Sequence, residues 1–382
     1  MVAACPFPAN RGTPSRILRM AEAIADRGHE VHVVTYHFGT DVPTRGIHIH
    51  RVPKVGKPYF GSGPTYRKLL LYDPLLTRLL RKVLREYCID LIHAHHFEGA
   101  LVALAARGWR DLPIIYDAHT MLSGELNQYR FRMPRPLKNW FARHLDRFVP
   151  KKSEHVIAVS ETLKDSLVQL GIPSERISVV PTGVNLETFE GDTGKSLVAG
   201  RHGITTEKVV VYAGSTAAFQ GVSYLLEAIP YVLQEEPETM FFIVGKKNST
   251  LSSLCKSKDI ADHVIFTGER PFEEVRNFLA QARVAVIPRP ECPGIPQKLT
   301  NYMAAGCAIV SFQGSAKLLT HEVNGIVVPD ANIRIMAEAI VRLLRNRELA
   351  DRLGENARQS VVQYDWRCLA ERVEKIYKDF VK

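Results

Sequence analysis

Cysteine is scarce in this sequence, and long hydrophobic runs are missing altogether. The six cysteines are scattered over 382 residues without a C-x-x-C pair, so we predict neither a zinc site nor a disulfide framework. This usage fits a reducing cytoplasm. No apolar run reaches the roughly 18 residues that span a bilayer, and the N-terminus lacks the basic flank and apolar stretch of a signal peptide. We therefore expect a globular cytoplasmic protein that contacts a membrane at most peripherally, on its inner face.

The net charge and the length of the chain indicate its binding partners and its number of domains. Lysine and arginine number 50 against 40 aspartates and glutamates, which gives a formal net charge of +10. Such an excess favours an anionic partner, which can be a nucleic acid, an acidic lipid surface or a phosphorylated substrate. No known nucleic-acid-binding module is recognisable, so we do not expect nucleic acid. The length exceeds that of one ordinary core and suits two domains.

Short apolar runs alternate with helical stretches along both halves of the chain. This βαβ alternation predicts parallel sheets covered by helices on both faces, that is, two Rossmann-like α/β domains. The predicted strands are Val31–Thr35, Leu91–His93, Ile114–Tyr116 and Val156–Val159 in the first half, and Val209–Tyr212, Phe241–Val244, Val264–Phe266, Val284–Ile287 and Ala308–Ser311 in the second.

A polar, Gly-rich break at Gly191–Lys195 marks the expected domain boundary. We predict an N-terminal domain of residues 1–185, a C-terminal domain of residues 186–364, and a final helix, residues 365–382, that crosses back to the N-terminal domain. This last helix carries an apolar stripe that includes Trp366, Val373 and Tyr377.

Three turns follow predicted strands and open helices. A turn of this kind offers free amides and a positive helix dipole to a phosphate, although each one could equally be a plain structural turn. The first is Asn10–Pro14, with Gly12 and Thr13; the second is Tyr212–Thr216, with Gly214 and Ser215, followed by Gln220; the third is Pro288–Lys298, with Arg289, Gly294, Ile295, Pro296, Gln297 and Lys298. Arg289 and Lys298 could neutralise a diphosphate.

Histidines gather after the strands of the first half. His95 and His96 follow one strand, and His119 follows the next, two residues after Asp117. Their spacing is not diagnostic of a metal site, so we expect no metal. His119 is either a structural histidine or one that faces an interdomain cleft, where it could donate to a sugar hydroxyl, a phosphate or a developing negative charge.

The segment Tyr129–Lys152 is strongly basic and carries a single acid, Asp146. We expect its apolar residues on one helical face, flanked by the basic ones: Leu137, Trp140, Phe141, Leu145 and Phe148. This pattern is typical of an interfacial membrane helix, but also of a helix packed on its own domain with a solvated basic rim. A second basic, leucine-rich stretch spans Tyr66–Arg85.

Five segments carry family motifs in a fixed order along nearly the whole chain. They are Asn10–Val34, Asp90–His95, Val179–Phe189, Lys298–Gly306 and Asn324–Pro329. This series resembles the family-4, glycogen-synthase-like retaining glycosyltransferases, which have the GT-B fold of two Rossmann-like domains facing across a cleft.

The resemblance implies a nucleotide-diphosphate sugar donor of the UDP or GDP type, held mainly by the second domain, and a glycan or lipid-linked acceptor. It implies hexosyl transfer with retention of configuration and without metal or cofactor. His119 matches the histidine near the reacting sugar. We expect the three turns and Asn301 to bind the donor, Gly245, Gly268 and Arg270 to form the nucleotide-base loop, and His95, His96 and Asp117 to lie on the acceptor side.

Two departures from the family pattern affect the donor site. Ser215 and Gln220 stand where many members carry an Arg and a Lys on the diphosphate, and Pro293 and Asn301 stand where many carry two glutamates. We expect Arg289 and Lys298 to replace the lost charge. Two alternatives remain: a nucleotide-sugar 2-epimerase on the same fold, and a non-catalytic paralogue that binds nucleotide sugars or membrane surfaces.

Overall fold

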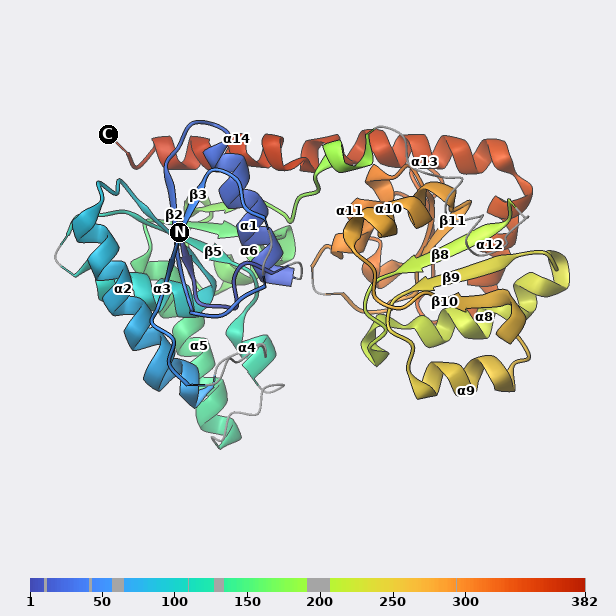
Figure 1. The fold of residues 1–382 in the computed structure, drawn as a ribbon, viewed down its shortest axis with the longest axis horizontal. Helices are drawn as coiled ribbons and strands as arrows, with labels where there is room; N and C mark the ends of the chain where they lie inside the picture. Colours follow the sequence, from blue (N-terminus) through green and yellow to red (C-terminus); the bar gives the residue numbers. More distant parts are fainter. Residues whose placement is uncertain are drawn as a thin grey trace. The chain divides into compact units, whose positions relative to one another are not determined.

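The computed structural model describes residues 1–9, 12–40, 43–56, 65–108, 110–126, 134–190, 207–292 and 294–381. It divides into two compact units (Figure 1): an N-terminal unit, Met1–Thr182 with Trp366–Lys382, and a C-terminal unit, Gly183–Asp365. The last helix thus packs with the N-terminal unit. The expected Gly-rich break at Gly191–Lys195 lies outside the described residues.

The N-terminal unit is built on a parallel sheet with strand order β3-β2-β1-β4-β5-β6-β7. Every described strand pair in it is parallel, as the βαβ pattern predicts. Its strands are β1 (Val2–Ala3), β2 (Val31–Thr35), β3 (Ile47–Arg51), β4 (Ile92–His95), β5 (Ile114–Ala118), β6 (His155–Ala158) and β7 (Ile177–Val179).

Side chains alternate across this sheet and divide its core into two layers. One face packs against α2, α3, α5 and α6, and the other packs against α1 and α14. The last helix therefore lies on the same face of the sheet as α1 (Figure 1), and its apolar side chains pack in the same cluster. The helices are α1 (Gly12–Ala25), a π-helical turn (Lys68–Tyr72), α2 (Asp73–Glu86), α3 (His96–Arg107), α4 (Leu122–Glu125), α5 (Arg135–Lys152), α6 (Glu161–Gln169), a 3₁₀ turn (Ser174–Arg176) and α14 (Trp366–Lys378).

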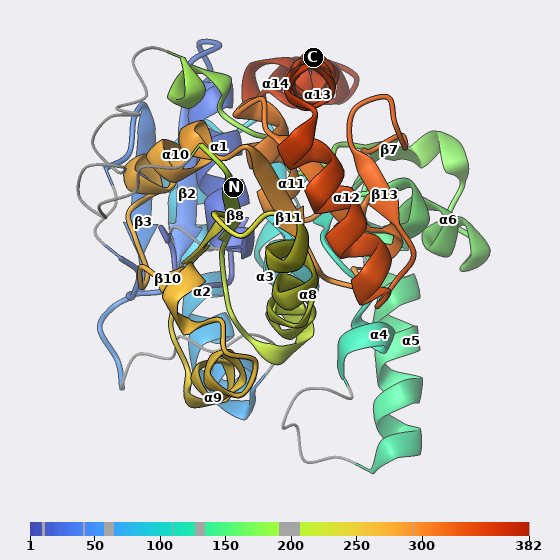
Figure 2. The ribbon, with the colours of Figure 1, turned by 90° about the vertical axis from the view of Figure 1, so that its right-hand side faces the viewer.

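The C-terminal unit repeats this architecture with strand order β10-β9-β8-β11-β12-β13. Helices α8, α9 and α12 cover one face, with α8 beside α12 in Figure 2, and α10, α11 and α13 cover the other. Its strands are β8 (Val209–Ala213), β9 (Met240–Val244), β10 (Val264–Phe266), β11 (Val284–Ile287), β12 (Ala308–Phe312) and β13 (Ile326–Val328). Its helices are α8 (Val222–Glu235), α9 (Ser249–Ser257), α10 (Phe272–Gln281), α11 (Gln297–Ala304), α12 (Ile333–Arg345) and α13 (Arg347–Val361), with 3₁₀ turns at Leu186–Phe189, Ala218–Gln220, Ala261–His263, Gln313–Ser315 and Val362–Tyr364.

Strand order reverses once in each sheet, and this fixes where ligands can bind. The reversal lies between β1 and β4 in the N-terminal unit and between β8 and β11 in the C-terminal unit. At such a switch point the loops leaving the two strands diverge to opposite faces and open a crevice at the carboxyl edge. The turns at Gly12–Thr13 and Gly214–Ser215 both follow a strand at a switch point.

The predicted apolar stripe of α5 is covered along one side only. Leu145 is buried and Phe141 partly buried in a cluster with α3 and α4. Leu137, Trp140 and Phe148 are 49%, 63% and 37% exposed on the outside. The predicted segment also includes residues 129–133, which lie outside the described part. None of the described helices combines the length and the apolar character that a membrane span requires.

A glycine holds the turn after β8 against the exit of β11. Gly221 has φ +71°, and a Cβ there would lie 1.8 Å from the Pro288 carbonyl oxygen. We expect Gly221→Ala to lower the free energy of unfolding by about 3 kcal/mol in urea denaturation, because backbone atoms must shift. Gly268→Ala is the matched control: its φ is +77° with no described atom within 4 Å of the added Cβ, so it should cost about 1 kcal/mol. Equal losses would contradict the steric argument.

Candidate active site

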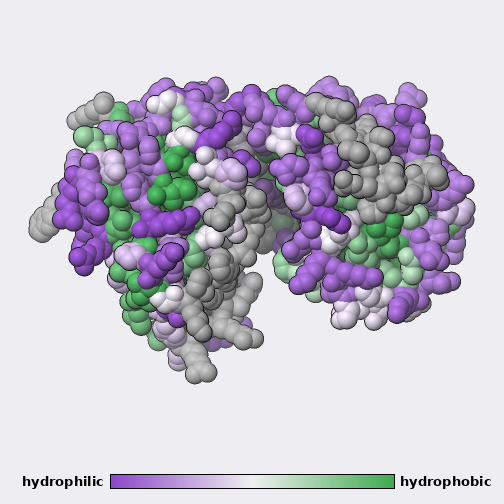
Figure 3. All heavy atoms as spheres, viewed as in Figure 1, coloured by the Kyte–Doolittle hydropathy of each residue, from purple (hydrophilic) through white to green (hydrophobic). Residues whose placement is uncertain are grey.

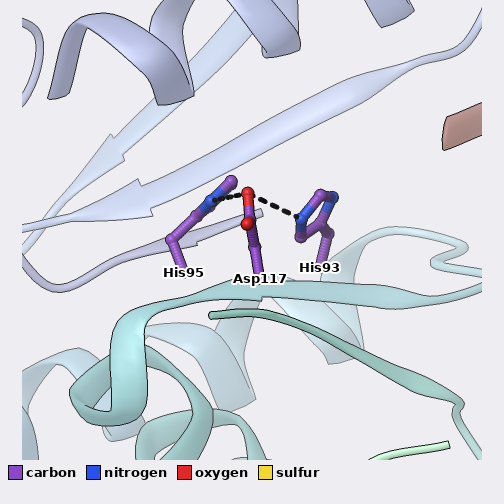
Figure 4. A group of neighbouring side chains, drawn as sticks. All are labelled: His93, His95 and Asp117. Atoms are coloured by element: carbon purple, nitrogen blue, oxygen red, sulfur yellow. Dashed lines mark hydrogen bonds and ion pairs between the residues drawn. The ribbon is translucent and has the colours of Figure 1, made fainter. Parts of the chain in front are cut away.

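A buried charged cluster lies beneath the switch point of the N-terminal sheet. In the sheet register His95 pairs with Asp117, so their side chains lie side by side on the face covered by α1 and α14. Asp117 is completely buried and accepts a hydrogen bond from His95 Nδ1 at 3.1 Å (Figure 4). Arg16 of α1 donates Nε to Asp117 Oδ2 and Nη2 to Oδ1, both at 3.2 Å. A bidentate ion pair thus connects α1 to the sheet.

Every charge in this pair is compensated, which makes its burial tolerable. Arg16 also donates to the carbonyl oxygens of Pro181 at 2.7 Å and Val180 at 2.8 Å. Burial alone would raise the pKa of Asp117, but the Arg16 guanidinium and the neighbouring His119 together hold it well below its usual range. Asp117 is therefore an anion at neutral pH.

One group of described side chains has the spacing of metal ligands: His93, His95 and Asp117. Both carboxylate oxygens of Asp117 already accept from Arg16, whose positive charge would repel a cation at the same place. We conclude that this group is a hydrogen-bonded support for the residues above it.

The ends of α1, β4 and β5 bring three predicted residues together. Thr13 Oγ1 lies 3.0 Å from His96 Nε2 and 3.4 Å from His119 Nδ1. The rings of His96 and His119 stack with centroids 4.3 Å apart. Burial, and then the neighbouring His119, lowers the pKa of His96 well below its ordinary value. His119 Nε2 lies 3.6 Å from Asp117 Oδ2, so His119 sits between an anion and the Gly12–Thr13 turn.

Two residues that were predicted to face the acceptor are buried instead. His95 is 1% exposed and Asp117 0%, so in this packing neither touches a molecule bound at the surface. They lie under His119 and support it. His96 is only partly buried and follows β4 directly.

Sequence reasoning assigned no role in this site to Asp146, which fixes the segment after His119. Its carboxylate accepts the backbone N–H groups of Leu122 at 2.8 Å and Ser123 at 2.9 Å, at the start of α4. A carboxylate in this position accepts hydrogen bonds from the free amides and interacts favourably with the positive end of the helix dipole. The signal was available, because Asp146 is the lone acid of its basic stretch.

Removing the charge of Asp117 should be costly. Asp117→Asn leaves Arg16 buried without its anion, and we expect a loss of about 3–5 kcal/mol in the free energy of unfolding. Because the pKa of Asp117 is lowered in the folded protein, its contribution is fully present above the unfolded pKa of about 4 and is lost as pH falls through the folded value. Urea denaturation at pH 5 to 8 should therefore show the full difference. Glu371→Gln, which breaks an exposed pair with Arg27 in the same unit, should change stability far less; a comparable loss in both would contradict the assignment.

The second set of predicted residues meets at the switch point of the C-terminal sheet. Lys298, in the first turn of α11, donates Nζ to Tyr212 OH at 2.7 Å and to Gln220 Oε1 at 2.9 Å. Gly214 has φ +137°, and a Cβ there would lie 3.2 Å from Lys298 Nζ, so glycine leaves room for the ammonium. Burial first, and then the Arg289 charge, lower the pKa of Lys298 to about 7.

The loop after β11 is held in place by hydrogen bonds to its backbone carbonyl groups and by a contact with the Phe219 ring. Arg289 donates Nε to the Glu291 carbonyl oxygen at 2.6 Å, and its guanidinium lies 5.1 Å from the centre of the Phe219 ring. Ser315 Oγ donates to the Arg289 carbonyl oxygen at 2.6 Å. Arg289 therefore has a fixed place in the loop that leads to α11, and Lys298 lies in the first turn of that helix.

The remaining predicted donor residues line the same edge. Residues 294–296 lead into α11, which begins at Gln297, with Pro296 as the capping residue before it. Gly245 packs on the turn after β8, where a Cβ would lie 2.3 Å from the Gly214 carbonyl oxygen. Gly268 and Arg270 follow the edge strand β10, and Ser215 accepts the Tyr212 hydroxyl through its carbonyl oxygen. Asn301 is partly buried on α11. Asn10, Arg11 and Pro293 lie outside the described residues.

Comparison with known proteins identifies this arrangement. Residues 11–188 match Glycosyltransferase Family 4, and residues 207–346 match Glycosyl transferases group 1. The chain belongs to the family-4 glycosyltransferases. It is 25% identical to an uncharacterized glycosyltransferase of Methanocaldococcus jannaschii, covering 94% of this chain and 92% of the relative. It is 24% identical to the phosphatidyl-myo-inositol mannosyltransferase of Mycobacterium leprae, covering 98% and 95%.

Solved structures show the same fold for this glycosyltransferase. The sucrose-phosphate synthase of Thermosynechococcus elongatus superposes with a TM-score of 0.79 at 18% identity, covering 99% of this chain and 97% of the other. Anabaena HepE, solved in complex with UDP, gives 0.77 at 17% identity, covering 99% and 98%. The predicted GT-B architecture of two parallel-sheet domains is confirmed. The enzyme class is also confirmed, and the two alternatives, an epimerase and a non-catalytic paralogue, are not favoured.

Proposed function

We propose that this glycosyltransferase moves a hexosyl group from a UDP- or GDP-sugar to an acceptor hydroxyl with retention of the anomeric configuration. The observation that carries the proposal is Lys298, a partly buried cation held by Tyr212 and Gln220 at the switch point of the C-terminal sheet. A buried cation with two neutral partners has capacity for an anion. Anabaena HepE, which has the same fold, binds UDP in its solved structure.

The donor diphosphate binds at the carboxyl edge of β8 and β11. Lys298 and Arg289 neutralise its charge, and the free amides at the start of α11 add the positive end of the helix dipole. Together they take over from the Arg and Lys that Ser215 and Gln220 replace. Asn301 hydrogen-bonds the donor ribose, and Gly245, Gly268 and Arg270 border the nucleotide base. Because side-chain cations supply the charge, the reaction needs no metal ion or cofactor.

His119 acts on the reacting sugar, with the Gly12–Thr13 turn beside it. Thr13 Oγ1 lies 3.4 Å from Nδ1, and the anionic Asp117 faces Nε2 at 3.6 Å, so the ring is oriented from both sides. A sugar oxygen reaches His119 at Nδ1, where it replaces Thr13 as the hydrogen-bond partner. Asp117 cannot serve as a nucleophile, because it is buried and bonded to Arg16. We therefore propose that retention proceeds without a covalent glycosyl intermediate on Asp117.

A donor screen tests this function directly. The protein is incubated with UDP-, GDP- and ADP-sugars and acceptor alcohols, released nucleotide diphosphate is quantified, and the anomeric configuration of the product is read from its proton NMR coupling. Release from one donor with a retained anomer supports the proposal. An inverted product would refute retention. Formation of a 2-epimer without acceptor, or donor binding in calorimetry without turnover on any acceptor, would each overturn the transferase assignment.

We further propose that the acceptor is lipid-linked and reached at an anionic membrane surface through α5. The outer face of this helix exposes Leu137, Trp140 and Phe148 beside Arg143 and Arg147, a pattern that suits the headgroup boundary. Hydrophobic side chains also interrupt the hydrophilic surface over α2 in Figure 3, and Leu70, just before it, is 77% exposed. The M. leprae relative is named for a phosphatidylinositol acceptor.

Vesicle binding tests the membrane proposal. Wild type should co-sediment with phosphatidylglycerol vesicles and not with pure phosphatidylcholine, and salt should weaken binding. Trp140→Ala combined with Phe148→Ala should release the protein, because aromatic side chains supply the apolar insertion. Val323→Ala, which removes an exposed apolar side chain of the C-terminal unit, is the control. Absence of wild-type binding at every salt concentration would refute the proposal.

A further inference from the structure

The C-terminal helix supplies side chains to both flanks of the buried cluster around Asp117. Tyr377 of α14 places its hydroxyl 2.5 Å from His93 Nδ1, and both residues are buried. Trp366, at the start of the same helix, has its ring centre 5.9 Å from the Arg16 guanidinium, within cation–π range. The support for His119 is therefore completed by the last helix of the chain, 284 residues beyond His93.

The Asp117 carboxylate and the Tyr377 hydroxyl lie against the two ring nitrogens of His93 and together fix its tautomer and orientation. Burial, and then the Asp117 charge, raise the pKa of Tyr377, so the phenol keeps its hydrogen. Burial lowers the pKa of His93 despite the opposing effect of Asp117, so the ring is neutral, with one donor and one acceptor nitrogen. Nδ1 accepts from the phenol, and Nε2–H then faces Asp117 Oδ2 at 3.7 Å (Figure 4).

The same carboxylate oxygen serves three histidines. His93 Nε2, His95 Nδ1 and His119 Nε2 lie 3.7, 3.1 and 3.6 Å from Asp117 Oδ2. Without the Tyr377 hydroxyl, His93 Nδ1 loses its hydrogen bond, and the ring can tilt and move Nε2 relative to the anion. Asp117 would then shift relative to His119, whose Nε2 has no hydrogen-bond partner within 3.5 Å among the described residues. A change at Tyr377 is thus transmitted through two buried side chains.

We propose that Tyr377 is a positioning residue for His119, acting through His93 and Asp117. The proposal rests on the role of His119 given under Proposed function. It makes α14 part of the catalytic machinery of the N-terminal unit, in addition to its apolar packing on α1.

Tyr377→Phe removes only the hydroxyl and keeps the buried ring. With the donor that the screen identifies, we expect kcat to fall about ten- to hundredfold, because a small misplacement near the reacting group is enough, while the donor KM stays within about twofold. Nitrogen-15 NMR of labelled imidazoles should show the loss of the hydrogen bond at His93 Nδ1 and shifted His119 signals. The matched control is Tyr36→Phe, which removes a buried hydroxyl that donates to Asp73 at 2.6 Å in the same unit; it should leave kcat and the His119 signals unchanged.

A double-mutant cycle with His93→Phe separates positioning from packing. If Tyr377 acts through His93, adding Tyr377→Phe to that variant should lower kcat no further. Additive losses, or His119 signals that are unchanged in Tyr377→Phe, would overturn the proposal. Shifted His119 signals in Tyr377→Phe together with full turnover in His119→Ala would uphold the structural link and refute the catalytic role of His119.

Discussion

His119→Ala should lower kcat about 10²–10³-fold in the glycosyl-transfer assay, with the donor KM changed by less than about threefold. The imidazole lies at the carboxyl edge of β5, and its ring is held on both sides by Asp117 and Thr13. A group oriented before substrate binds gives its full interaction in the transition state without reorganisation. Because the proposed donor site lies in the C-terminal unit, we expect donor binding to be spared.

The control for this variant is another strand histidine of the same sheet. His155 begins β6 at the amino edge, and its Nε2 bonds Ser178 Oγ at 2.9 Å. His155→Ala should reduce stability but leave kcat of the folded protein near wild type. Turnover of His119→Ala within about fivefold of wild type would remove His119 from the mechanism and leave the C-terminal donor site as the remaining basis of the proposed function.

Three of the four strands at the two switch points, β4, β8 and β11, could be predicted because they are buried on both faces. The run Val284–Ile287 is continuously apolar and mostly β-branched, and the structure gives β11 the same bounds. The fourth strand, β1, has only the residues Val2–Ala3, too few for a periodic signal. β3 was missed because its sequence alternates isoleucine with histidine and its side chains are partly exposed at the sheet edge. β7 and β13, with three residues each, were also missed, although the equally short β10 was predicted.

Some residues around His119 could likewise be predicted from the sequence, and others could not. Thr13, His96 and His119 could be predicted because each follows a strand or opens a helix at the ligand-binding edge. Arg16 and Tyr377 could not, because each acts through a partner far away along the chain: Arg16 reaches Asp117 across 101 residues, and Tyr377 reaches His93 across 284. A local signal did exist for the ion pair, since Asp117 interrupts an otherwise apolar strand. A buried acid in such a strand requires a cation from elsewhere in the fold.

For the apolar stripe of α5, the sequence could not predict which of its residues are buried. Periodicity gives the residues that share a face but not what covers that face. Leu145 and Leu137 both belong to the predicted stripe, yet one is 7% and the other 49% exposed, because α3 and α4 cover only one side of the helix.

Nucleotide binding should depend on pH through Lys298. Its pKa is lowered to about 7 by burial and by Arg289, and a bound diphosphate must raise that pKa because an anion favours the ammonium. Affinity for UDP is therefore greatest below pH 7 and falls, by up to about tenfold per pH unit, as pH rises above the pKa of the free protein. The fall ends at the higher pKa of the complex. Calorimetry between pH 7.5 and 9, in two buffers of different ionisation enthalpy, should show proton uptake with each UDP bound.

Lys298→Met provides the test that a side-chain cation is responsible. The variant should bind UDP about ten- to hundredfold more weakly, since a charge-assisted hydrogen bond to an anion is lost, and its affinity should no longer change over this pH range. Lys317→Met, which removes an exposed lysine of the same unit, should keep both the affinity and the proton uptake of wild type. UDP binding that is independent of pH in the wild type would mean that Lys298 does not contact the diphosphate, and Arg289 with the amides of α11 would have to carry its charge alone.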